Sequence, residues 1–442
     1  MKKSITRSLA EFVKTISYEN LPAVVAYRAK NLILDALGTA IGGREMPCSR
    51  IALELVKGDR GNATILAYGM RVSPVNAAFV NAVLTSAVVL DDFLFSFHPG
   101  QVNVPTAIAV AEQEGSSGVE LISAVVSGYE VMGRVYLGAP SIVPKFRGTP
   151  VFGPFGSAAA AGKLLKLNED QLTNALGYSA HFASGFNEGS LAGTMEGYFH
   201  GGVAARNGIM AASLAKAGAT ASEESLEGKQ GFYQAFGTTQ KVDNALHDLG
   251  KRFLIMEASY KAYPVVALQQ IPIDLILRLV KKHQILAQDI KGIIEKVPYW
   301  EAIYPGGDSA GPFEKPLQAL MSAPFCAAAA FLGKLVRSYS FYADNYNDPE
   351  VFALAQKVRL IGEKDRKMPE ITVRLNDGKT YSIEEEEKEG TLIPTDDKIR
   401  TKFNELTSSF LGEKRVNEIV DIIMSLEKVS NIRELTQRLS PL

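Results

Sequence analysis

Four stretches of the chain combine acidic, basic or imidazole side chains with glycine or proline, and the first is LDDFLFSFHPG. In it Asp91 and Asp92 precede His98 by only a few residues. A histidine titrates near neutral pH, and a carboxylate that orients it completes a general acid/base pair. The same spacing also suits a helix end followed by a loop with a hydrogen-bonded histidine, so the residues alone leave both interpretations open.

The second stretch is KFRGTPVFGPFGSAAAAGKLL. Lys145 and Arg147 precede a Thr/Pro/Gly loop that we expect to enter an alanine-rich helix near Gly156. The amides at a helix start and a guanidinium suit an anionic group such as a carboxylate. The glycine spacing matches neither a Walker A motif nor a dinucleotide fingerprint. The alternative is that the small residues only permit close helix packing.

The third and fourth stretches are GTMEGYFHGG and YKAYPVVALQQ. Tyr198 and His200 lie on a glycine-rich approach to a helix, where their side chains can face a cavity. Lys261 lies at the predicted junction between two domains, and clefts between domains are common ligand sites. A structural histidine and a surface lysine are the simpler alternatives.

Composition excludes several classes of function. The 442 residues include 47 Lys plus Arg and 48 Asp plus Glu, so the net charge of −1 provides no field for binding a nucleic acid. The only cysteines, Cys48 and Cys326, support no disulfide scaffold, Cys-rich zinc site or iron–sulfur cluster. The N-terminus lacks the apolar core of a secretory signal, and no segment approaches the ~20 apolar residues of a membrane span. We therefore expect a cytoplasmic protein with a small-molecule substrate and no membrane partner.

The elements that position these residues are predicted to be mostly helices. Helical periodicity and small residues at three- and four-residue spacing indicate a tightly packed helical body over residues 1–265. Its predicted helices are 31–41, 77–90, 104–113, 121–135, 157–165 and 203–217.

The pattern changes after Tyr263-Pro264. We expect helices at 270–282 and 317–335, and strands at 290–297, 357–361, 369–375 and 379–385. Asn376-Asp377-Gly378 predicts a hairpin turn, and Glu384–Glu387 a solvated strand end. The segment from Asp396 onward is again helical and amphipathic, and should pack on the first body. The predicted fold is mostly α with an inserted α+β domain: a helical domain of 1–265 completed by 396–442, and a smaller domain of 266–395.

In these same regions the sequence resembles the MmgE/PrpD family, which includes 2-methylcitrate dehydratase, cis-aconitate decarboxylase and iminodisuccinate epimerase. The resemblance rests on motifs that recur in order over about residues 25–265. These are NLILDALGTAIGG, AFVNAVLTSAVVLDDF followed by HPG, SGYEVMGRV, FGPFGSAAAAGKLLKL, HGGVAARNGIMAASLAKAGATASEESLEGKQGFYQAFG and SYKAYP. EKPLQALMSAPFCAAAAFLG and the PEITVRLNDG hairpin extend it over nearly the whole chain.

The resemblance implies a homodimer of helical domains with smaller α+β lids, and a site at the domain interface that needs no metal or other cofactor. It implies a lyase or isomerase that acts on small di- or tricarboxylates by proton abstraction beside a carboxylate, giving dehydration, decarboxylation or epimerisation. The general acid/base would be His98, oriented by Asp91 or Asp92, and His200 and Lys261 would also be catalytic. The substrate would be bound by Arg147, Tyr198, Tyr263 and Gln270.

The sequence departs from the family pattern at several site positions. Val89 and Phe93 replace the first Asp and the Thr of an Asp-x-Asp-Asp-Thr motif, and Arg147 stands where a histidine is common. Gly197 replaces a lysine, Phe325 a tyrosine, and Val266 and Gln270 histidines. Because losing a proton-transfer group costs ~10²–10⁴-fold in rate, we expect a substrate or reaction that differs from those of characterised members. The alternatives are a non-catalytic paralogue that binds a small anion, and a paralogue recruited to a more apolar ligand.

Overall fold

The computed structural model describes residues 3–237, 241–385 and 396–441. They form two compact units. The first contains the described residues up to Gly185, then Tyr198–Tyr260 and the C-terminal segment from residue 396. The second contains Phe186–Gly197 and the described residues from Lys261 to 385. None of the helices in these described ranges is long and apolar enough to cross a membrane.

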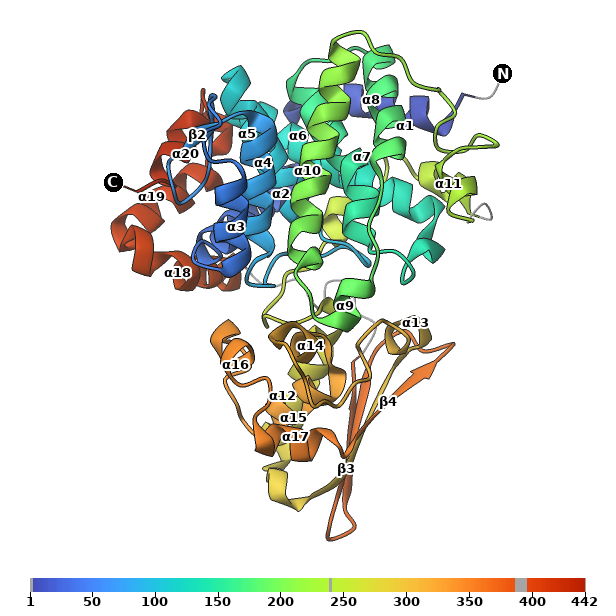
Figure 1. Ribbon diagram of the computed structural model, residues 1–442, viewed down its shortest axis with the longest axis vertical. Helices are drawn as coiled ribbons and strands as arrows, with labels where there is room; N and C mark the ends of the chain where they lie inside the picture. The colour runs from blue at the N-terminus through green and yellow to red at the C-terminus, as the bar shows by residue number, and fades with distance from the viewer. Residues whose placement is uncertain (1–2, 238–240, 386–395, 442) are drawn as a thin grey trace. The chain divides into compact units, whose positions relative to one another are not determined.

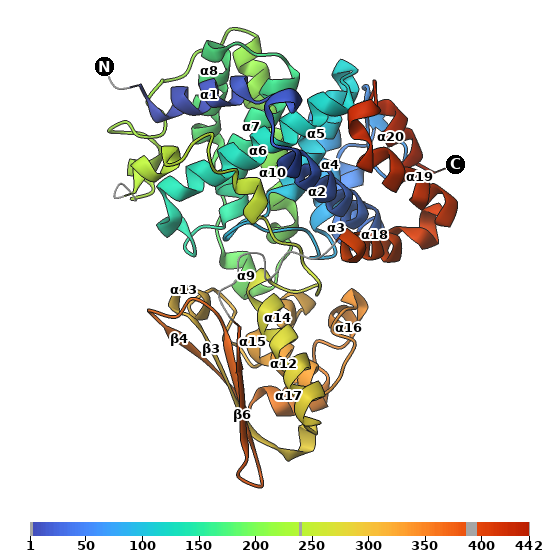
Figure 2. The ribbon, with the colours of Figure 1, turned by 180° about the vertical axis from the view of Figure 1, so that it is seen from behind.

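The first unit is helical, as predicted (Figures 1 and 2). Its long helices are α1 (Ile5–Thr15), α2 (Ala23–Gly42), α3 (Pro47–Leu55), α4 (Pro74–Ser86), α5 (Gly100–Glu114), α6 (Gly118–Gly138), α7 (Gly148–Leu164), α8 (Glu169–Phe182), α10 (Glu196–Lys216), α18 (Asp396–Leu411) and α19 (Glu413–Met424). Two short helices, α11 (Phe232–Ala235) and α20 (Arg433–Arg438), and a two-residue strand pair, β1 (Ala63–Thr64) with β2 (Arg71–Val72), complete it. The strand pair was not predicted.

Short 3-10 turns connect these helices and those of the second unit. They are Tyr18–Asn20, Pro140–Ile142, Val242–Leu246, Leu254–Glu257, Ala267–Gln269, Ala287–Asp289 and Leu426–Lys428.

Helix α2 is the centre of the first unit, since nearly every residue from Arg28 to Ile41 is buried. The C-terminal segment packs on it, as predicted: the Phe403 ring of α18 lies so close to Gly38 of α2 that a Cβ there would be 2.9 Å from the ring. Small residues thus let the two helix backbones approach closely. The two ends of the chain therefore build one core.

Several helix boundaries in this unit differ from the predictions: the helices predicted from residues 31 and 203 begin at Ala23 and Glu196, and two further differences bear on the site. The helix predicted over 77–90 ends at Ser86, and Val89 has a left-handed backbone with φ of 55°. The helix predicted from residue 157 begins at Gly148 instead. Pro154 lies inside it and cannot donate to the carbonyl of Pro150, which accepts from the Ser184 amide at 3.4 Å. The Ser184 amide therefore satisfies the carbonyl that Pro154 leaves open, and Pro150 is tolerated because it lies in the first turn, where its N–H would have no helical partner.

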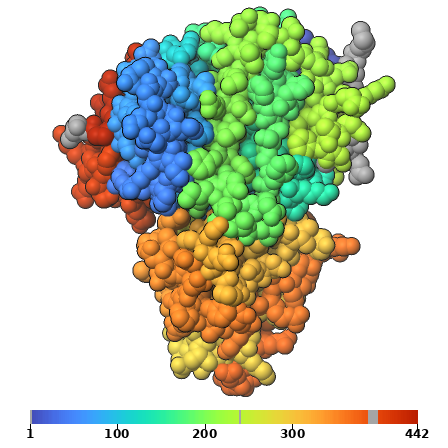
Figure 3. All heavy atoms as spheres, in the orientation of Figure 1, coloured from blue at the N-terminus to red at the C-terminus, as the bar shows by residue number. Residues whose placement is uncertain are grey.

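The face of the molecule in Figure 3 includes the surface of α10, in light green. On this helix Val203 and Met210 are exposed apolar residues, 38% and 40% accessible. They stand seven residues apart, so they lie on the same side of the helix.

The second unit contains a mixed four-stranded sheet in the order β4-β3-β5-β6. The strands are β3 (Ile290–Pro298), β4 (Val358–Glu363), β5 (Glu370–Leu375) and β6 (Thr380–Glu384). Strand β3 pairs in parallel with β4, with Ile293 opposite Val358, and antiparallel with β5. The helices of this unit are α9 (Glu188–Ala192), α12 (Gln270–His283), α13 (Tyr299–Ala302), α14 (Pro316–Met321), α15 (Ala323–Phe331), α16 (Tyr339–Asp344) and α17 (Pro349–Ala355).

The predicted hairpin is confirmed: β5 and β6 pair antiparallel, and Gly378 in the turn has φ of 90°. Glu384 ends β6 as an exposed residue paired with Arg366 at 2.6 Å, while Glu386 and Glu387 lie outside the described residues. The predicted helix 317–335 is instead two helices, broken at Ser322. Pro324 has no N–H to donate to the Leu320 carbonyl four residues earlier, and the Ser322 hydroxyl accepts from the Phe325 amide at 2.9 Å as the cap of α15.

The units divide at Tyr260/Lys261, close to the domain boundary expected at residue 265. The other expected boundary, near residue 396, falls beside residues outside the described ranges. The segment Phe186–Gly197, expected in the helical domain, groups with the second unit.

Candidate functional site

The loop between α4 and α5 carries the acid–histidine stretch, and backbone pairing fixes its course. The amide and carbonyl of Phe93 bond to the carbonyl and amide of Ser259 at 2.8 and 2.7 Å. Leu94 and Phe97 pair in the same way across a tight turn, in which Phe95 has φ of 54°. This turn reverses the chain and brings His98 back onto Asp91 and Asp92.

His98 contacts both aspartates through one ring nitrogen. Its Nδ1 lies 3.0 Å from Oδ2 of Asp91 and 2.9 Å from the main-chain oxygen of Asp92. Because both oxygens are acceptors, Nδ1 carries a proton, and in the neutral ring Nε2 then holds the lone pair. The side chain of Asp91 is therefore the one that orients His98. Asp92 contributes only its main chain to that contact.

The carboxyl of Asp92 is used inside the fold. Its Oδ1 accepts from the Gly100 amide at 2.9 Å, and its Oδ2 lies 2.8 Å from the Tyr129 hydroxyl. Burial, with the nearby charge of Asp35 as a second cause, raises the pKa of Asp92 to about 8. A Cβ on residue 100 would lie 2.1 Å from Oδ1 of Asp92, so glycine is required there.

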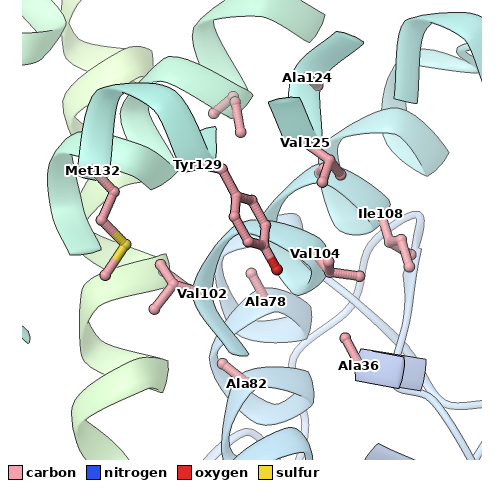
Figure 4. Packing of buried hydrophobic residues seen from close by; sticks show 14 of the residues in the cluster. Ala36, Ala78, Ala82, Val102, Val104, Ile108, Ala124, Val125, Tyr129 and Met132 are labelled. Atoms are coloured by element: carbon pink, nitrogen blue, oxygen red, sulfur yellow. The ribbon is translucent and has the colours of Figure 1, made fainter. Parts of the chain in front are cut away.

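The apolar surroundings of Tyr129 explain the burial. Figure 4 shows its ring among Val102, Val104 and Ala78 of the neighbouring helices. Burial and the adjacent Asp92 raise the pKa of Tyr129 well above its ordinary value, so both groups are protonated at neutral pH. The Asp92–Tyr129 pair is thus a neutral hydrogen-bonded link between the loop and α6.

The start of α7 lies beside His98. The main-chain amide of His98 donates to the Thr149 hydroxyl at 3.1 Å, and a Cβ at Gly148 would be 2.7 Å from the Ser96 carbonyl. Arg147 is the N-cap residue of α7 and donates its amide to Gly185 at 3.2 Å. The positive helix end predicted near Gly156 therefore lies eight residues earlier, next to the histidine.

Three further residues support the aspartates, and the sequence reasoning missed them. Gln101 donates to Oδ2 of Asp91 at 3.0 Å. Asp35 of α2 is buried and bonds to Lys402 of α18 at 2.6 Å. A signal for Asp35 was present, because it is the only acidic residue of helix α2 and interrupts the apolar run from Leu32 to Leu37. Lys402 gave none, since it is one charge among many in an amphipathic helix.

Tyr198 and His200 lie in the first turns of α10 and are half-buried. The Tyr198 carbonyl accepts from the Ser86 hydroxyl at 3.0 Å, which ties α10 to the end of α4. Helix α10 therefore lies against the helix that leads into the Asp91 loop.

The other predicted site residues belong to the second unit. Lys261 is its first residue after Tyr260 and is buried, with 2% of its surface exposed. Gln270 holds the following loop: its Oε1 accepts from the amides of Ala262 and Tyr263 at 2.9 and 3.1 Å, and its Nε2 donates to the Tyr263 carbonyl at 2.8 Å. The Tyr263 ring lies under the guanidinium of Arg337, 4.8 Å from its centroid.

The apolar replacements differ in their surroundings. Phe325 is fully buried in an aromatic cluster with Phe313, Phe341 and Tyr342. Val266 is half-buried, as are Val89 and Phe93. Phe325 thus provides no hydroxyl at this position, and its ring packs closely against the neighbouring rings.

The described part of the chain contains no group of three or more His, Cys, Asp or Glu side chains arranged to hold a metal ion. Of the other histidines, His181 and His247 are exposed, and His283 stacks on Tyr381 with the ring centroids 4.1 Å apart.

Comparisons with known proteins cover nearly the whole chain. Residues 7–245 match the model of the MmgE/PrpD N-terminal domain, and residues 263–428 match that of the MmgE/PrpD C-terminal domain. The cis-aconitate decarboxylase of Aspergillus terreus (strain NIH 2624 / FGSC A1156) is 26% identical, with 99% of this chain and 96% of the relative aligned. The human cis-aconitate decarboxylase is 28% identical over 99% of this chain and 94% of its own length.

A third relative, the cis-aconitate decarboxylase-like protein oryM of Aspergillus oryzae, is 27% identical over 99% of this chain and 97% of its own length. The names of the two cis-aconitate decarboxylases describe lyases. With both domain models matched in order, the chain belongs to the MmgE/PrpD family.

Proposed function

We propose that the protein is a lyase or isomerase that moves a proton at a carbon next to a carboxylate of a small carboxylic acid. The observation that carries this proposal is the contact of the Asp91 carboxylate with Nδ1 of His98 at 3.0 Å. A carboxylate in this position fixes the tautomer and stabilises the imidazolium that forms when Nε2 accepts a proton. His98 is the general acid/base in this proposal, and Asp91 is the residue that orients it.

Charge stabilisation comes from the start of α7 and from cationic side chains. Removing a proton beside a carboxylate builds negative charge on the substrate, and fixed positive charge near that position lowers the barrier. The amides of the first turn of α7 and the guanidinium of Arg147 provide such charge. In this proposal Lys261 is a catalytic cation that holds a carboxylate, and His200 is a secondary proton donor. The residues that bind the substrate are Tyr198, Tyr263 and Gln270.

The relatives make cis-aconitate the first compound to test. The purified protein is incubated with cis-aconitate and with a panel of other small di- and tricarboxylic acids, and products are followed by NMR and by released carbon dioxide. We expect turnover of at least one acid, and its loss in His98→Asn. Turnover that His98→Asn leaves unchanged would contradict the proposed role of His98.

A second candidate function is binding without turnover, and the altered positions favour it. Gln270 is engaged by its own loop, Phe325 is packed among rings, and Gly197 has no side chain to transfer a proton. The alternative ligand is a small anion or a more apolar acid. A thermal-shift screen with the same acids separates the two functions, because a ligand that binds the folded state raises the melting temperature whether or not it reacts. Stabilisation without turnover would favour the binding function.

A further inference from the structure

Three buried carboxyls lie close together behind His98. Asp35 and Asp92 each have at most 3% of their surface exposed, as does Asp91. Burial raises the pKa of Asp35, with Lys402 lowering it and Asp91 raising it. Asp35 in turn acts on Asp92, whose raised pKa it helps to cause. The charge on Asp35 therefore interacts electrostatically with Asp91 and Asp92, the two residues that contact His98.

Lys402 is the cation that meets this cluster directly. Its Nζ donates to Oδ1 of Asp35 at 2.6 Å and to the main-chain oxygen of Leu90 at 2.5 Å. Leu90 is the residue immediately before Asp91. One ammonium group thus bonds both to a buried carboxylate and to the backbone that leads into the acid–histidine loop.

Lys402 is well placed to keep these contacts. Its side chain is 15% exposed and that of Asp35 is 1% exposed, so solvent screens the pair only weakly. The next residue, Phe403, is buried against Gly38 of α2, which fixes the register of the two helices. Arg28 also acts on Asp35, but its guanidinium lies over the Tyr260 ring, 4.5 Å from the centroid, and bonds to the Ala258 carbonyl.

From these contacts we infer that Lys402 is a positioning residue of the site: its ammonium compensates the charge of Asp35 and anchors Leu90, and so sets the electrostatic environment and position of the Asp91–His98 pair. This inference rests on the proposed role of His98. The ionisable groups around the pair are Asp35, Asp91, Asp92, Tyr129, Tyr260, Arg28 and Lys402.

The inference predicts different responses for the two halves of the ion pair. Lys402→Met removes the cation that keeps Asp35 ionised, so the buried carboxyl takes up a proton and the titration midpoint of His98 stays near the wild-type value. Asp35→Asn leaves the excess positive charge of Lys402, which disfavours the imidazolium and lowers the midpoint. The double variant Asp35→Asn/Lys402→Met removes both charges and should return the midpoint to the wild-type value. Lys402→Arg keeps the charge and should stay near wild type.

The test is an NMR titration of histidine-labelled full-length protein, with the His98 signal assigned by its absence in His98→Asn. We expect Asp35→Asn to lower the midpoint by roughly 0.3 pH unit or more, and Lys402→Met to leave it near the wild-type value. The matched control is Lys398→Met, which removes an exposed lysine of the same helix. If Lys402→Met does not fold, Asp35→Asn and the double variant still test the sign and the cancellation.

An unchanged or raised midpoint in Asp35→Asn, or a shift that persists in the double variant, would overturn the inference. The titration needs no substrate, so its outcome is independent of whether any acid turns over. Where turnover is found, the double variant should still lower kcat, because Leu90 loses its donor, while the midpoint of the pH profile stays at the wild-type value. A double variant with wild-type kcat would overturn the anchoring part of the inference.

Discussion

Asp91 and His98 form the part of the site whose geometry indicates its chemistry most directly, since they have the arrangement of a general acid/base pair. The Asp91 carboxylate accepts from Nδ1 of His98 and from Nε2 of Gln101, each at 3.0 Å. Two donors on one oxygen hold the carboxylate in place, and the carboxylate holds the ring. In the proposed function, proton transfer by His98 therefore depends on Asp91, a residue that does not itself need to touch the substrate.

Asp91→Asn should lower turnover strongly, by roughly 10²-fold or more, because the amide lacks the charge that stabilises the imidazolium. Steady-state kinetics on whichever acid reacts measures the effect. His247→Asn removes an exposed histidine and serves as the control. An Asp91→Asn protein that is folded and as active as wild type would show that the carboxylate is not needed.

Asp92 provides a prediction about stability and pH. Its pKa is about 8 in the folded protein, whereas an unfolded chain has an ordinary value of ~4. Between these values the folded state binds more protons than the unfolded state, so this group lowers stability as the pH rises. Asp92→Asn keeps the shape and removes the titration.

Urea unfolding of wild type and Asp92→Asn, from about pH 5 to about pH 8, measures this difference. The free energy of unfolding should fall more steeply with rising pH in wild type than in the variant. Glu130 and Glu295, whose pKa values burial raises to about 7, contribute the same sign in both proteins and cancel in the comparison. Parallel curves would contradict the assignment of a neutral Asp92.

The sequence predicted the members of this group but not their arrangement. LDDFLFSFHPG is compact enough that Asp91, Asp92 and His98 had to be near one another. Which aspartate meets the ring depends on the turn at Phe95 and on the pairing of Phe93 with Ser259, a residue far along the chain. Tyr129 and Lys402 could not be predicted, because they contact the loop from α6 and α18. How these distant helices pack on the loop cannot be inferred from the local sequence pattern.

At the scale of elements, α7 links the alanine-rich sequence to the site. Its first turn carries Thr149, which accepts from the His98 amide, and Gly148 allows that turn to lie against Ser96. The helix begins earlier than predicted. Pro150 and Pro154 lie in its first two turns, and because prolines are typical of loops, the sequence pattern did not indicate a helix there. The helix start that was predicted to bind an anion therefore lies beside His98 and not near Gly156.

Gly148→Ala should displace the start of α7, since its Cβ would lie 2.7 Å from the Ser96 carbonyl. We expect the free energy of unfolding to fall by about 1–3 kcal/mol, as for overpacking elsewhere, and turnover to fall with it. Gly292→Ala in β3, where a Cβ would lie 3.8 Å from the Lys357 carbonyl oxygen at an ordinary van der Waals distance, controls for the general effect of replacing a glycine. Unchanged stability in Gly148→Ala would show that the contact can relax without cost.

Other elements were predicted well where the pattern was local. The hairpin at Asn376-Asp377-Gly378 and the strand Ile290–Pro298 follow from turn chemistry and β-branched residues. The helix break at Ser322 was missed because apolar, helix-forming sequence continues on both sides of it. The serine cap and Pro324 decide the break, and their effect outweighs the helical periodicity.

At the scale of the whole molecule, both ends of the chain build the first unit. The C-terminal helix α18 supplies Lys402 to the centre of that unit, so the inserted second unit separates parts of one core in the sequence. The fold class could be predicted because the change in pattern after Tyr263-Pro264 is abrupt. No comparable change in the sequence pattern indicates that Phe186–Gly197 groups with the second unit.

The homodimer stays a prediction, and α10 offers a surface on which to test it. Light scattering after size exclusion should give a mass near twice 47.8 kDa. Val203→Lys/Met210→Lys places two charges on the exposed apolar side of α10 and should shift the protein toward the monomer. Leu335→Lys, at an apolar residue 74% exposed in the second unit, is the control. A wild-type monomer would contradict the prediction of a dimer.

The proposed function requires that His98 transfers a proton at a carbon beside a carboxylate. Solvent-deuterium exchange measures this transfer, because it detects proton removal even when no net product forms. Wild-type protein in deuterium oxide should incorporate deuterium at such a carbon of at least one small carboxylic acid, and His98→Asn should abolish the incorporation while keeping the fold. Exchange at the wild-type rate in a folded His98→Asn protein, or no exchange with any acid that binds, would contradict the proposed role of His98.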